Sequence, residues 1–186
     1  MTVRTYYGKE VQPKTAEELV EHWKSVFGDG ILDVEIRKRT AGVVRKMEYS
    51  CIWIKVKREI FHSFVAEMAR EQVPHLAVAS GVDEGEEIHL NYHFSLYYGI
   101  PYREIPIIVK VPLPKSDPTI DTISDILPGA LITEREKQEM LGVIVRNIPD
   151  PRRVFTGDID GFYPWRKDND PKMEKKYCKS LSEVGL

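Results

Sequence analysis

Residues 88 to 96 alternate apolar and polar side chains at every position. The apolar set is Ile88, Leu90, Tyr92, Phe94 and Leu96, and the polar set is His89, Asn91, His93 and Ser95. Successive side chains of a β-strand point to opposite faces, so this pattern predicts a strand with one buried face. Residues 105–111 repeat the alternation after a turn over residues 98–103. The fold must therefore cover the apolar face of a sheet.

Two amphipathic helices are predicted before these strands. Thr15 to Glu18 has the residues of a capping box, and an apolar stripe at helical spacing continues to Phe27. A second stripe runs from Ile60 to Ala69, and Pro74 closes it. Each stripe predicts a helix that packs one side on a core.

Three further strands complete the predicted sheet. Residues 32–37 and 43–57 are extended segments that we expect to pair as a hairpin, and residues 75–80 form a short strand. The resulting order is helix, two strands, helix, three strands. It predicts an α+β fold, a mixed, largely antiparallel sheet with helices packed on one face, plus an extended C-terminal arm.

The last third of the chain begins with two short predicted helices. Residues 121–127 form the first, which a Pro-Gly pair stops. Thr133 to Glu136 is a second capping box, which opens a helix that continues to about Leu141. Both helices are expected to belong to the compact part of the chain.

Helical and strand periodicity is lost after Gly142. Proline, basic and aromatic residues accumulate there, with few aliphatic ones. We therefore expect a compact α+β domain over residues 1–143 and an extended C-terminal docking arm over residues 144–186. An arm with so little apolar surface is expected to gain order by lying across another protein.

Composition and charge exclude several classes of function. The formal net charge is −2, with 27 Lys and Arg against 29 Asp and Glu, so no global charge favours nucleic acid or anionic lipid as a partner. No apolar run approaches the roughly 20 residues that cross a bilayer, and the first residues lack the apolar core of a signal peptide. Membrane association is expected only through partners. Three Asn and three Gln beside many charged residues favour a hyperthermophilic source.

The sequence contains no recognisable cofactor or metal motif. Cys51 and Cys178 form no C-x-x-C pair, so we expect free thiols and no iron–sulfur cluster. Phosphate-binding glycine loops and nucleophile elbows are also missing. His89 and His93 share a strand face but lie about 13 Å apart at ~3.3 Å per residue, which favours a solvated face. A metal hydrolase that uses these two with His75 remains a hypothesis.

Two charged segments have alternative interpretations. The acidic residues from Asp83 to Glu87 lack the pattern of a calcium loop and are expected in a solvated turn. Arg152, Arg153 and the run Trp165 to Lys167 combine basic and planar residues, as single-strand nucleic-acid binders do. Neighbouring aspartates nearly cancel their charge, which favours a protein partner and no nucleic acid. A free-standing single-strand nucleic-acid binding module remains the alternative of another class.

Four short motifs follow one another in the last third of the chain. They are Glu134-Arg135-Glu136, Met140-Leu141-Gly142, Pro149-Asp150-Pro151-Arg152-Arg153 and Pro164-Trp165-Arg166-Lys167-Asp168. Between about Leu32 and Asp168 the chain resembles the NADH dehydrogenase C-subunit family, the small hydrophilic subunit of complex I and related membrane-bound hydrogenases. Departures from the respiratory pattern favour a divergent branch, as in archaeal membrane-bound hydrogenase or sulfur-reducing complexes. The departing residues are Gln138, Glu139, Leu141, Ile148 and Trp165.

The resemblance implies a non-catalytic structural subunit in the peripheral arm of a complex I-like oxidoreductase. Such a subunit docks the large catalytic-type subunit and the small iron–sulfur subunit, for electron transfer coupled to ion translocation, at the cytoplasmic face of the cell membrane. It binds no cofactor, metal or small-molecule substrate itself. Iron–sulfur clusters, and nickel–iron in a hydrogenase, belong to partner subunits. A subunit of a respiratory NADH:quinone-type dehydrogenase is the alternative within the family.

The motifs also indicate which residues dock the partners. These residues are Glu134, Arg135, Glu136, Arg152, Arg153, Trp165, Arg166, Lys167 and Asp168. A helix dipole favours carboxylates in the first turn, and an arginine fork can bind a carboxylate or carbonyl of a partner. The same charges can instead hold the arm on its own domain, and charged pairs alone do not separate the two possibilities.

Overall fold

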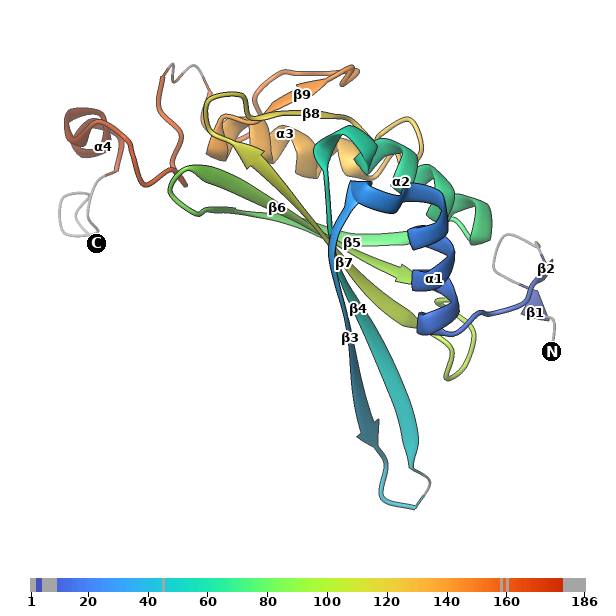
Figure 1. The fold of residues 1–186 in the computed structure, drawn as a ribbon. Helices are drawn as coiled ribbons and strands as arrows, with labels where there is room; N and C mark the ends of the chain where they lie inside the picture. The colour runs from blue at the N-terminus through green and yellow to red at the C-terminus, as the bar shows by residue number, and fades with distance from the viewer. Residues whose placement is uncertain (1–2, 5–9, 45, 158, 160, 179–186) are drawn as a thin grey trace.

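A computed structural model describes residues 3–4, 10–44, 46–157, 159 and 161–178, and a five-stranded sheet lies at its centre (Figure 1). The strands are β3 (Ile31–Ala41), β4 (Met47–Val56), β5 (His75–Asp83), β6 (Glu87–Leu96) and β7 (Ile105–Pro114). Their spatial order is β3-β4-β7-β6-β5. Strands β4 and β7 are parallel and the other three pairs are antiparallel. The predicted mixed, largely antiparallel sheet is confirmed.

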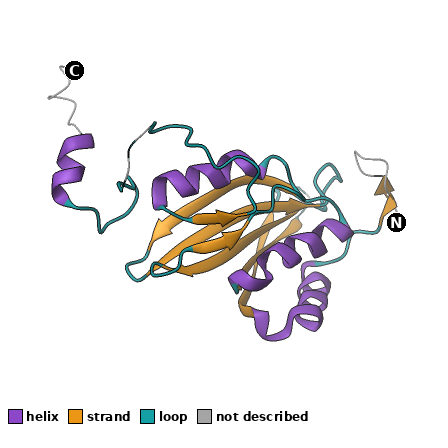
Figure 2. Cartoon of the chain, turned by 90° about the horizontal axis from the view of Figure 1, so that it is seen from above, coloured by secondary structure: helices purple, strands orange, loops and turns teal. Residues whose placement is uncertain are grey.

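Three helices cover one face of this sheet (Figure 2). They are α1 (Ala16–Phe27), α2 (Arg58–Glu71) and α3 (Ala130–Leu141). In α2, Phe61 packs on Tyr92 of β6 with ring centroids 4.5 Å apart. Trp23 of α1 meets Phe64 of α2 edge-on at 5.0 Å. Leu141 of α3 closes the space above Gly81 on the same face, so the helices share the apolar side, as predicted.

The alternation in β6 produces the predicted burial. Every even-numbered residue from Ile88 to Leu96 is buried, whereas the odd-numbered residues from Glu87 to Ser95 are partly exposed. The odd-numbered side chains of β6 share their face of the sheet with side chains of the other strands. His93 of β6 pairs with Ile108 of β7 and with Val78 of β5, and Ile108 pairs with Trp53 of β4. One face of the sheet is thus covered by helices and the other is open.

The predicted capping box at the start of α1 is present. The Thr15 hydroxyl accepts a hydrogen bond from the Glu18 N–H at 3.2 Å, and the Thr15 N–H donates to Glu18 Oε2 at 2.7 Å. These two bonds satisfy amide groups that have no partner inside the helix. Helix α1 ends at Gly28, where the 3-10 turn η1 (Gly28–Gly30) leads into β3.

Two local predictions in the last third are wrong. Residues 121–127 form no helix; a strand end and a turn occupy them. Helix α3 begins at Ala130 after Gly129, so Thr133 lies inside the helix and its hydroxyl donates to the Ala130 carbonyl at 3.0 Å. The Pro-Gly pair therefore precedes the start of a helix and does not stop one.

The smaller elements lie at the margins of the domain. They are β1 (Val3–Arg4), β2 (Glu10–Val11), β8 (Thr119–Asp121), β9 (Ile144–Arg146) and α4 (Pro171–Tyr177). Strand β9 belongs to the predicted arm, yet it pairs in parallel with β8 of the predicted compact domain. The residues after 143 therefore contact that domain, and their docking on another subunit stays a prediction. Within the described part of the chain, no helix is both long and apolar enough to span a bilayer.

Candidate functional site

Glu134, the first residue of the motif string, lies inside the protein. It belongs to α3, and it is fully buried. Thr122 Oγ1 donates to Glu134 Oε2 at 2.5 Å, and the Ile123 N–H donates to Oε1 at 2.9 Å. Burial raises the pKa of this carboxyl above its usual value, although both hydrogen bonds oppose the shift. Glu134 thus holds the turn after β8 against α3, and a partner cannot reach it without rearrangement of that turn.

Glu139, one of the residues that depart from the respiratory pattern, binds the arm. Its carboxylate accepts hydrogen bonds from the Val154 N–H at 2.8 Å, the Phe155 N–H at 2.9 Å, the Thr156 N–H and the Thr156 hydroxyl at 2.6 Å. Burial alone would raise the pKa of this carboxyl, but the four donors outweigh it and lower the pKa to about 2. One side chain of α3 therefore fixes three successive residues of the arm.

Arg135 points at the same segment from a nearby position of α3. Its Nε donates to the Arg152 carbonyl at 2.7 Å, and its Nη1 lies 3.2 Å from Asp150 Oδ2. Asp150 also pairs with Arg152 at 2.8 Å, which helps to hold the Asp150 pKa below its usual range. The Arg153 guanidinium donates to the Thr156 hydroxyl at 3.2 Å. The two motifs that contain these arginines are therefore joined to each other within the chain.

The last motif, Pro164 to Asp168, lies across the C-terminal end of α3. The Trp165 N–H donates to the Met140 carbonyl at 2.9 Å, and Arg166 Nε donates to the Leu141 carbonyl at 2.6 Å. These two carbonyls are in the last turn of a helix, where they lack helical partners. The motif thus caps the helix to which it is attached.

Gly142 permits this close approach. Its φ is +68°, and a Cβ at this position would lie 2.7 Å from the Tyr163 ring. The Arg166 guanidinium also lies near this ring, 4.9 Å from its centroid. A left-handed residue without a side chain is therefore needed between α3 and the arm.

The acidic turn after β5 contributes the third anchor of the arm. Asp83 Oδ2 accepts a hydrogen bond from the Lys167 N–H at 2.8 Å and pairs with Lys115 Nζ at 2.7 Å. Lys115 also reaches Asp168 at 3.2 Å. Burial acts to raise the Asp83 pKa, but these partners and the Gly85 N–H lower it to about 2. The expectation of a solvated turn is wrong for Asp83, because this residue is buried. Its backbone partner, Lys167, lies 84 residues further along the chain, where no local pattern could indicate it.

The remaining predicted docking residues differ in accessibility. The Arg152 side chain is 83% exposed, the Trp165 residue is 44% exposed, and Lys167 and Asp168 are exposed. The Glu136 carboxylate pairs with Lys137, whose ammonium lies 4.9 Å from the Trp165 ring centroid. Within the motif string, the groups accessible to a partner are therefore Arg152, the outer face of Trp165, and the exposed residues Lys167 and Asp168. Their docking role stays a prediction.

The three histidines of the hydrolase hypothesis have separate surroundings. His89 Nε2 lies 2.8 Å from Glu87 Oε2, His93 Nε2 lies 3.5 Å from Ser80 Oγ, and His75 packs against Tyr98. Among the residues that the structure describes, no three His, Cys, Asp or Glu side chains converge on one point that could hold a metal ion. Cys51 and Cys178 are free thiols.

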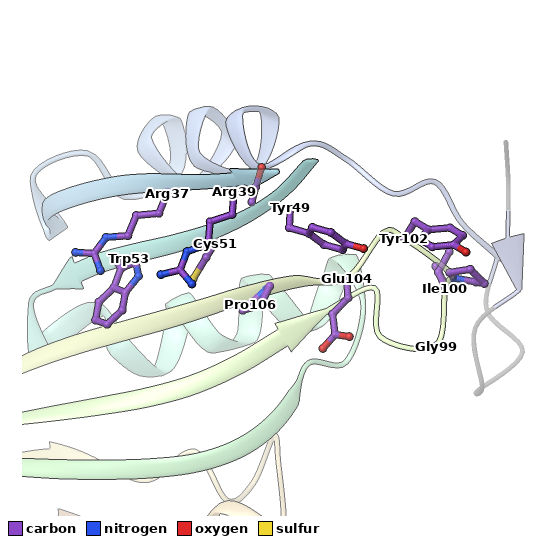
Figure 3. Close-up of a pocket in the computed structure, with 12 residues that line it drawn as sticks. Arg37, Arg39, Tyr49, Cys51, Trp53, Gly99, Ile100, Tyr102, Glu104 and Pro106 are labelled. Atoms are coloured by element: carbon purple, nitrogen blue, oxygen red, sulfur yellow. The ribbon is translucent and has the colours of Figure 1, made fainter. Parts of the chain in front are cut away.

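The open face of the sheet holds a groove that the motif string does not indicate. Its volume is about 740 Å³, and it lies between the β3–β4 hairpin and the segment from Gly99 to Pro106 (Figure 3). Arg37 lies over the Trp53 ring at 4.4 Å and is held by Glu35 at 2.8 Å. Burial raises the pKa of the neighbouring Cys51 thiol. This surface combines aromatic, apolar and cationic groups.

A sequence signal for this surface existed. Ile52, Ile54 and Val56 predict the core face of β4, but Tyr49, Cys51 and Trp53 occupy the alternate positions. A strand with apolar or aromatic residues on both faces needs a cover on both faces. The helices α1, α2 and α3 all lie on the first face (Figure 2). Within the described part of the chain, no helix covers the second face, which carries Tyr49, Cys51 and Trp53.

Comparison with known proteins gives consistent matches. The family model of the respiratory-chain NADH dehydrogenase 30 kDa subunit matches residues 54–175. The membrane-bound hydrogenase subunit beta of Pyrococcus furiosus is 32% identical over 121 residues, which are 63% of this chain and 69% of that protein. The C-subunit of the NADH-quinone oxidoreductase of Chloroherpeton thalassium is 33% identical over 106 residues, 56% of this chain and 43% of that protein.

A solved structure shares the fold. One chain of the membrane-bound sulfane sulfur reductase, described as an archaeal respiratory membrane complex, aligns with a TM-score of 0.60 and 21% identity. The alignment covers 88% of this chain and 92% of that chain. The shared fold therefore includes most of both chains.

Proposed function

The chain belongs to the family of the respiratory-chain NADH dehydrogenase 30 kDa subunit, and from that membership we propose that it is a non-catalytic structural subunit of a complex I-like membrane-bound oxidoreductase. The observation that carries the proposal is the ordered motif string together with the family match over residues 54–175. The open sheet face and the exposed Trp165 edge supply surfaces for two neighbours.

Within the family, we favour a complex of the hydrogenase or sulfur reductase type. The Pyrococcus hydrogenase protein is 32% identical over 121 residues, whereas the C-subunit of the NADH-quinone oxidoreductase of Geotalea uraniireducens aligns over more of its own length, 80%, but is only 27% identical. Glu139 supports this branch, since it departs from the respiratory pattern and its carboxylate organises residues 154–156 of the arm. A respiratory NADH:quinone-type complex remains the second candidate because the identities of the Pyrococcus and Chloroherpeton proteins are nearly equal.

The proposed role is mechanical. The chain would hold the large catalytic-type subunit and the small iron–sulfur subunit in fixed positions at the cytoplasmic face of the cell membrane. Electron transfer slows steeply when redox centres separate, so fixed positions matter even for a subunit that carries no centre. Iron–sulfur clusters, and nickel–iron in a hydrogenase, are assigned to the partners. Electron transfer and coupled ion translocation are then properties of the complex.

Affinity purification from membranes tests the proposal. A tag on this chain, expressed from its own locus, is expected to recover a large subunit and an iron–sulfur subunit in constant ratio after mild detergent extraction. Absorption of iron–sulfur clusters should accompany the recovered complex. Recovery of the 21.5 kDa chain alone from the soluble fraction would contradict the proposal.

A further inference from the structure

The outer halves of β3 and β4 form a two-stranded ribbon that projects beyond the sheet (Figure 1). Residues 47–51 of β4 pair with β3, whereas pairing between β4 and β7 begins only at Ile52. Within the described part of the chain, the second edge of β4 is therefore unpaired along residues 47–51. An unpaired edge presents backbone N–H and C=O groups to which another strand can bond.

The groove on the open face lies directly beside this edge. Tyr49 and Cys51 line it from the ribbon, and Ile100, Tyr102 and Pro106 line it from the opposite segment (Figure 3). The groove has a volume of about 740 Å³. Five residues of extended chain span about 17 Å at roughly 3.4 Å per residue, so residues 47–51 offer an edge of that length.

The charged groups that line the groove can orient an occupant. Two arginines and one glutamate line it, namely Arg37, Arg39 and Glu104. Arg37 is paired with Glu35, whereas neither Arg39 nor Glu104 makes an ion pair with any residue that the structure describes. An arginine beside an apolar surface binds a carboxylate with a planar, two-bond geometry. Arg39 is therefore suited to bind a carboxylate of a partner.

Exposed apolar groups surround the same groove. Tyr49 is 44% exposed and Tyr102 is 69% exposed. At the tip of the ribbon, Val43 and Val44 are completely exposed to solvent. A two-stranded ribbon is marginally stable without a third strand or a covering surface. Aromatic side chains at the edge of a groove are typical anchors of protein contacts.

We propose that this groove binds an extended segment of a partner subunit, which adds a strand to the free edge of β4 and places an Asp or Glu side chain on Arg39. An apolar side chain near that carboxylate packs between Tyr49 and Tyr102. The inference rests on the proposed function, because it requires a partner subunit, and it specifies which surface and which chemistry that partner uses.

The observations favour a polypeptide over a small molecule. A volume of about 740 Å³ also falls in the range of small-ligand pockets, roughly 300–1,000 Å³. A small ligand in the groove would leave the backbone edge at residues 47–51 and the exposed tip without partners. A strand from another chain satisfies the edge, the arginine and the aromatic pair together.

Photo-cross-linking in the assembled complex tests the proposal. p-Benzoylphenylalanine replaces Tyr49, with a matched control at Val26, which is 50% exposed on α1 behind the sheet. We expect the label at position 49 to join a partner peptide that contains Asp or Glu close to an apolar residue, and the label at position 26 to give a different product or none. Cross-links only within this chain, only to a second copy, or to nothing would overturn the proposal.

Charge reversal at Arg39 provides an independent measurement. Arg39→Glu is expected to weaken retention of the chain in the complex by about tenfold or more. Arg39→Lys keeps the positive charge and should weaken it less, and Lys24→Glu on the far face should have no effect. Replacing the cross-linked Asp or Glu of the partner by Lys should restore retention of the Arg39→Glu variant in the complex. Retention equal to wild type for Arg39→Glu would overturn the inference.

These experiments separate failure of the inference from failure of the proposed function. If the chain assembles with its partners but position 49 and Arg39 are unimportant, the proposed function stands and the groove assignment falls. If the unmodified chain joins no complex, the proposed function fails and the inference fails with it. Hydrogen exchange at residues 47–51 should slow by about tenfold or more on assembly if a strand is added, and an unchanged rate excludes strand addition.

Discussion

Asp83 accepts a hydrogen bond from the backbone N–H of Lys167 at 2.8 Å, although 84 residues separate the two along the chain. The same carboxylate pairs with Lys115, and its side chain is completely buried. This contact fastens the motif Pro164 to Asp168 to the central sheet. The family motif is therefore held against the chain's own domain.

Removal of the Asp83 charge should loosen the arm. Asp83→Asn keeps the size of the side chain but leaves Lys115 without its buried partner, and we expect a loss of about 2 kcal/mol in the free energy of unfolding. Chemical denaturation measures the loss, and limited proteolysis should show faster cleavage after residue 157. Glu84→Gln in the same turn, where the side chain is exposed, is the control. Equal stability of both variants would contradict this role of Asp83.

Glu139 is expected to hold the arm from the other side. Glu139→Gln replaces a carboxylate that accepts hydrogen bonds from four donors. The new side-chain NH2 group cannot accept a hydrogen bond, so it faces donors that it cannot satisfy. We expect a loss of about 2 kcal/mol, by comparison with other hydrogen bonds to charged groups. Heteronuclear NMR should show that the amides of residues 154–156 shift more than any others. Unchanged signals there would refute the assignment.

Acid should release both anchors together. The pKa values of Asp83 and Glu139 are lowered to about 2 in the folded protein, below the roughly 3.9 and 4.3 of unfolded chains. Each carboxylate therefore contributes about 2 to 3 kcal/mol to the free energy of unfolding above about pH 4.5, and this contribution is lost as the pH falls toward 2. The pH dependence that Glu134 contributes has the opposite sign. Its pKa is raised in the folded protein, so its ionisation lowers the stability as the pH rises.

Urea denaturation between pH 2 and 5 measures this dependence. Stability of the wild type should fall steeply with acid over that window. The double variant Asp83→Asn with Glu139→Gln should be less stable than the wild type at pH 5. Its free energy of unfolding should also fall much less than that of the wild type between pH 5 and 2. A double variant with the same acid dependence as the wild type would show that other carboxylates control the transition.

Gly142 offers a test of the contact between α3 and the arm. Gly142→Ala introduces a Cβ 2.7 Å from the Tyr163 ring at a φ of +68°, and we expect a loss of about 2 kcal/mol. Gly85→Ala has a φ of +91° and open space around the new Cβ, so its loss of about 1 kcal/mol reports backbone strain alone. Thermal unfolding compares the two. Equal losses would show that Tyr163 does not press on this position.

The central domain could be predicted well because its sequence signals are local. The alternation from Ile88 to Leu96 and the capping box at Thr15 both act over a few residues, and both appear in the structure. The start of α3 was misplaced because Thr133 to Glu136 has the residues of a capping box without its geometry. Local residue types could not show that Gly129 precedes the helix.

The site was harder to predict because its contacts span the chain. The motif string identified Arg135 and Trp165, but the acceptor of Arg135 lies 17 residues later and is a backbone carbonyl, which has no sequence signature. The buried state of Asp83 depends on Lys167, which no local pattern connects to it. The position of the groove depends on the residue at which β4 begins to pair with β7, which is a property of the assembled sheet and not of either strand alone.

Native mass spectrometry of the detergent-extracted complex tests the proposed function most directly. We expect one assembly that contains this chain at 21.5 kDa, a large subunit and an iron–sulfur subunit, with stepwise loss of this chain when Arg39 is changed to Glu. The chain should carry no bound cofactor mass after it is released. A spectrum in which the chain occurs only as a free monomer, while the complex assembles without it, would contradict the proposed function.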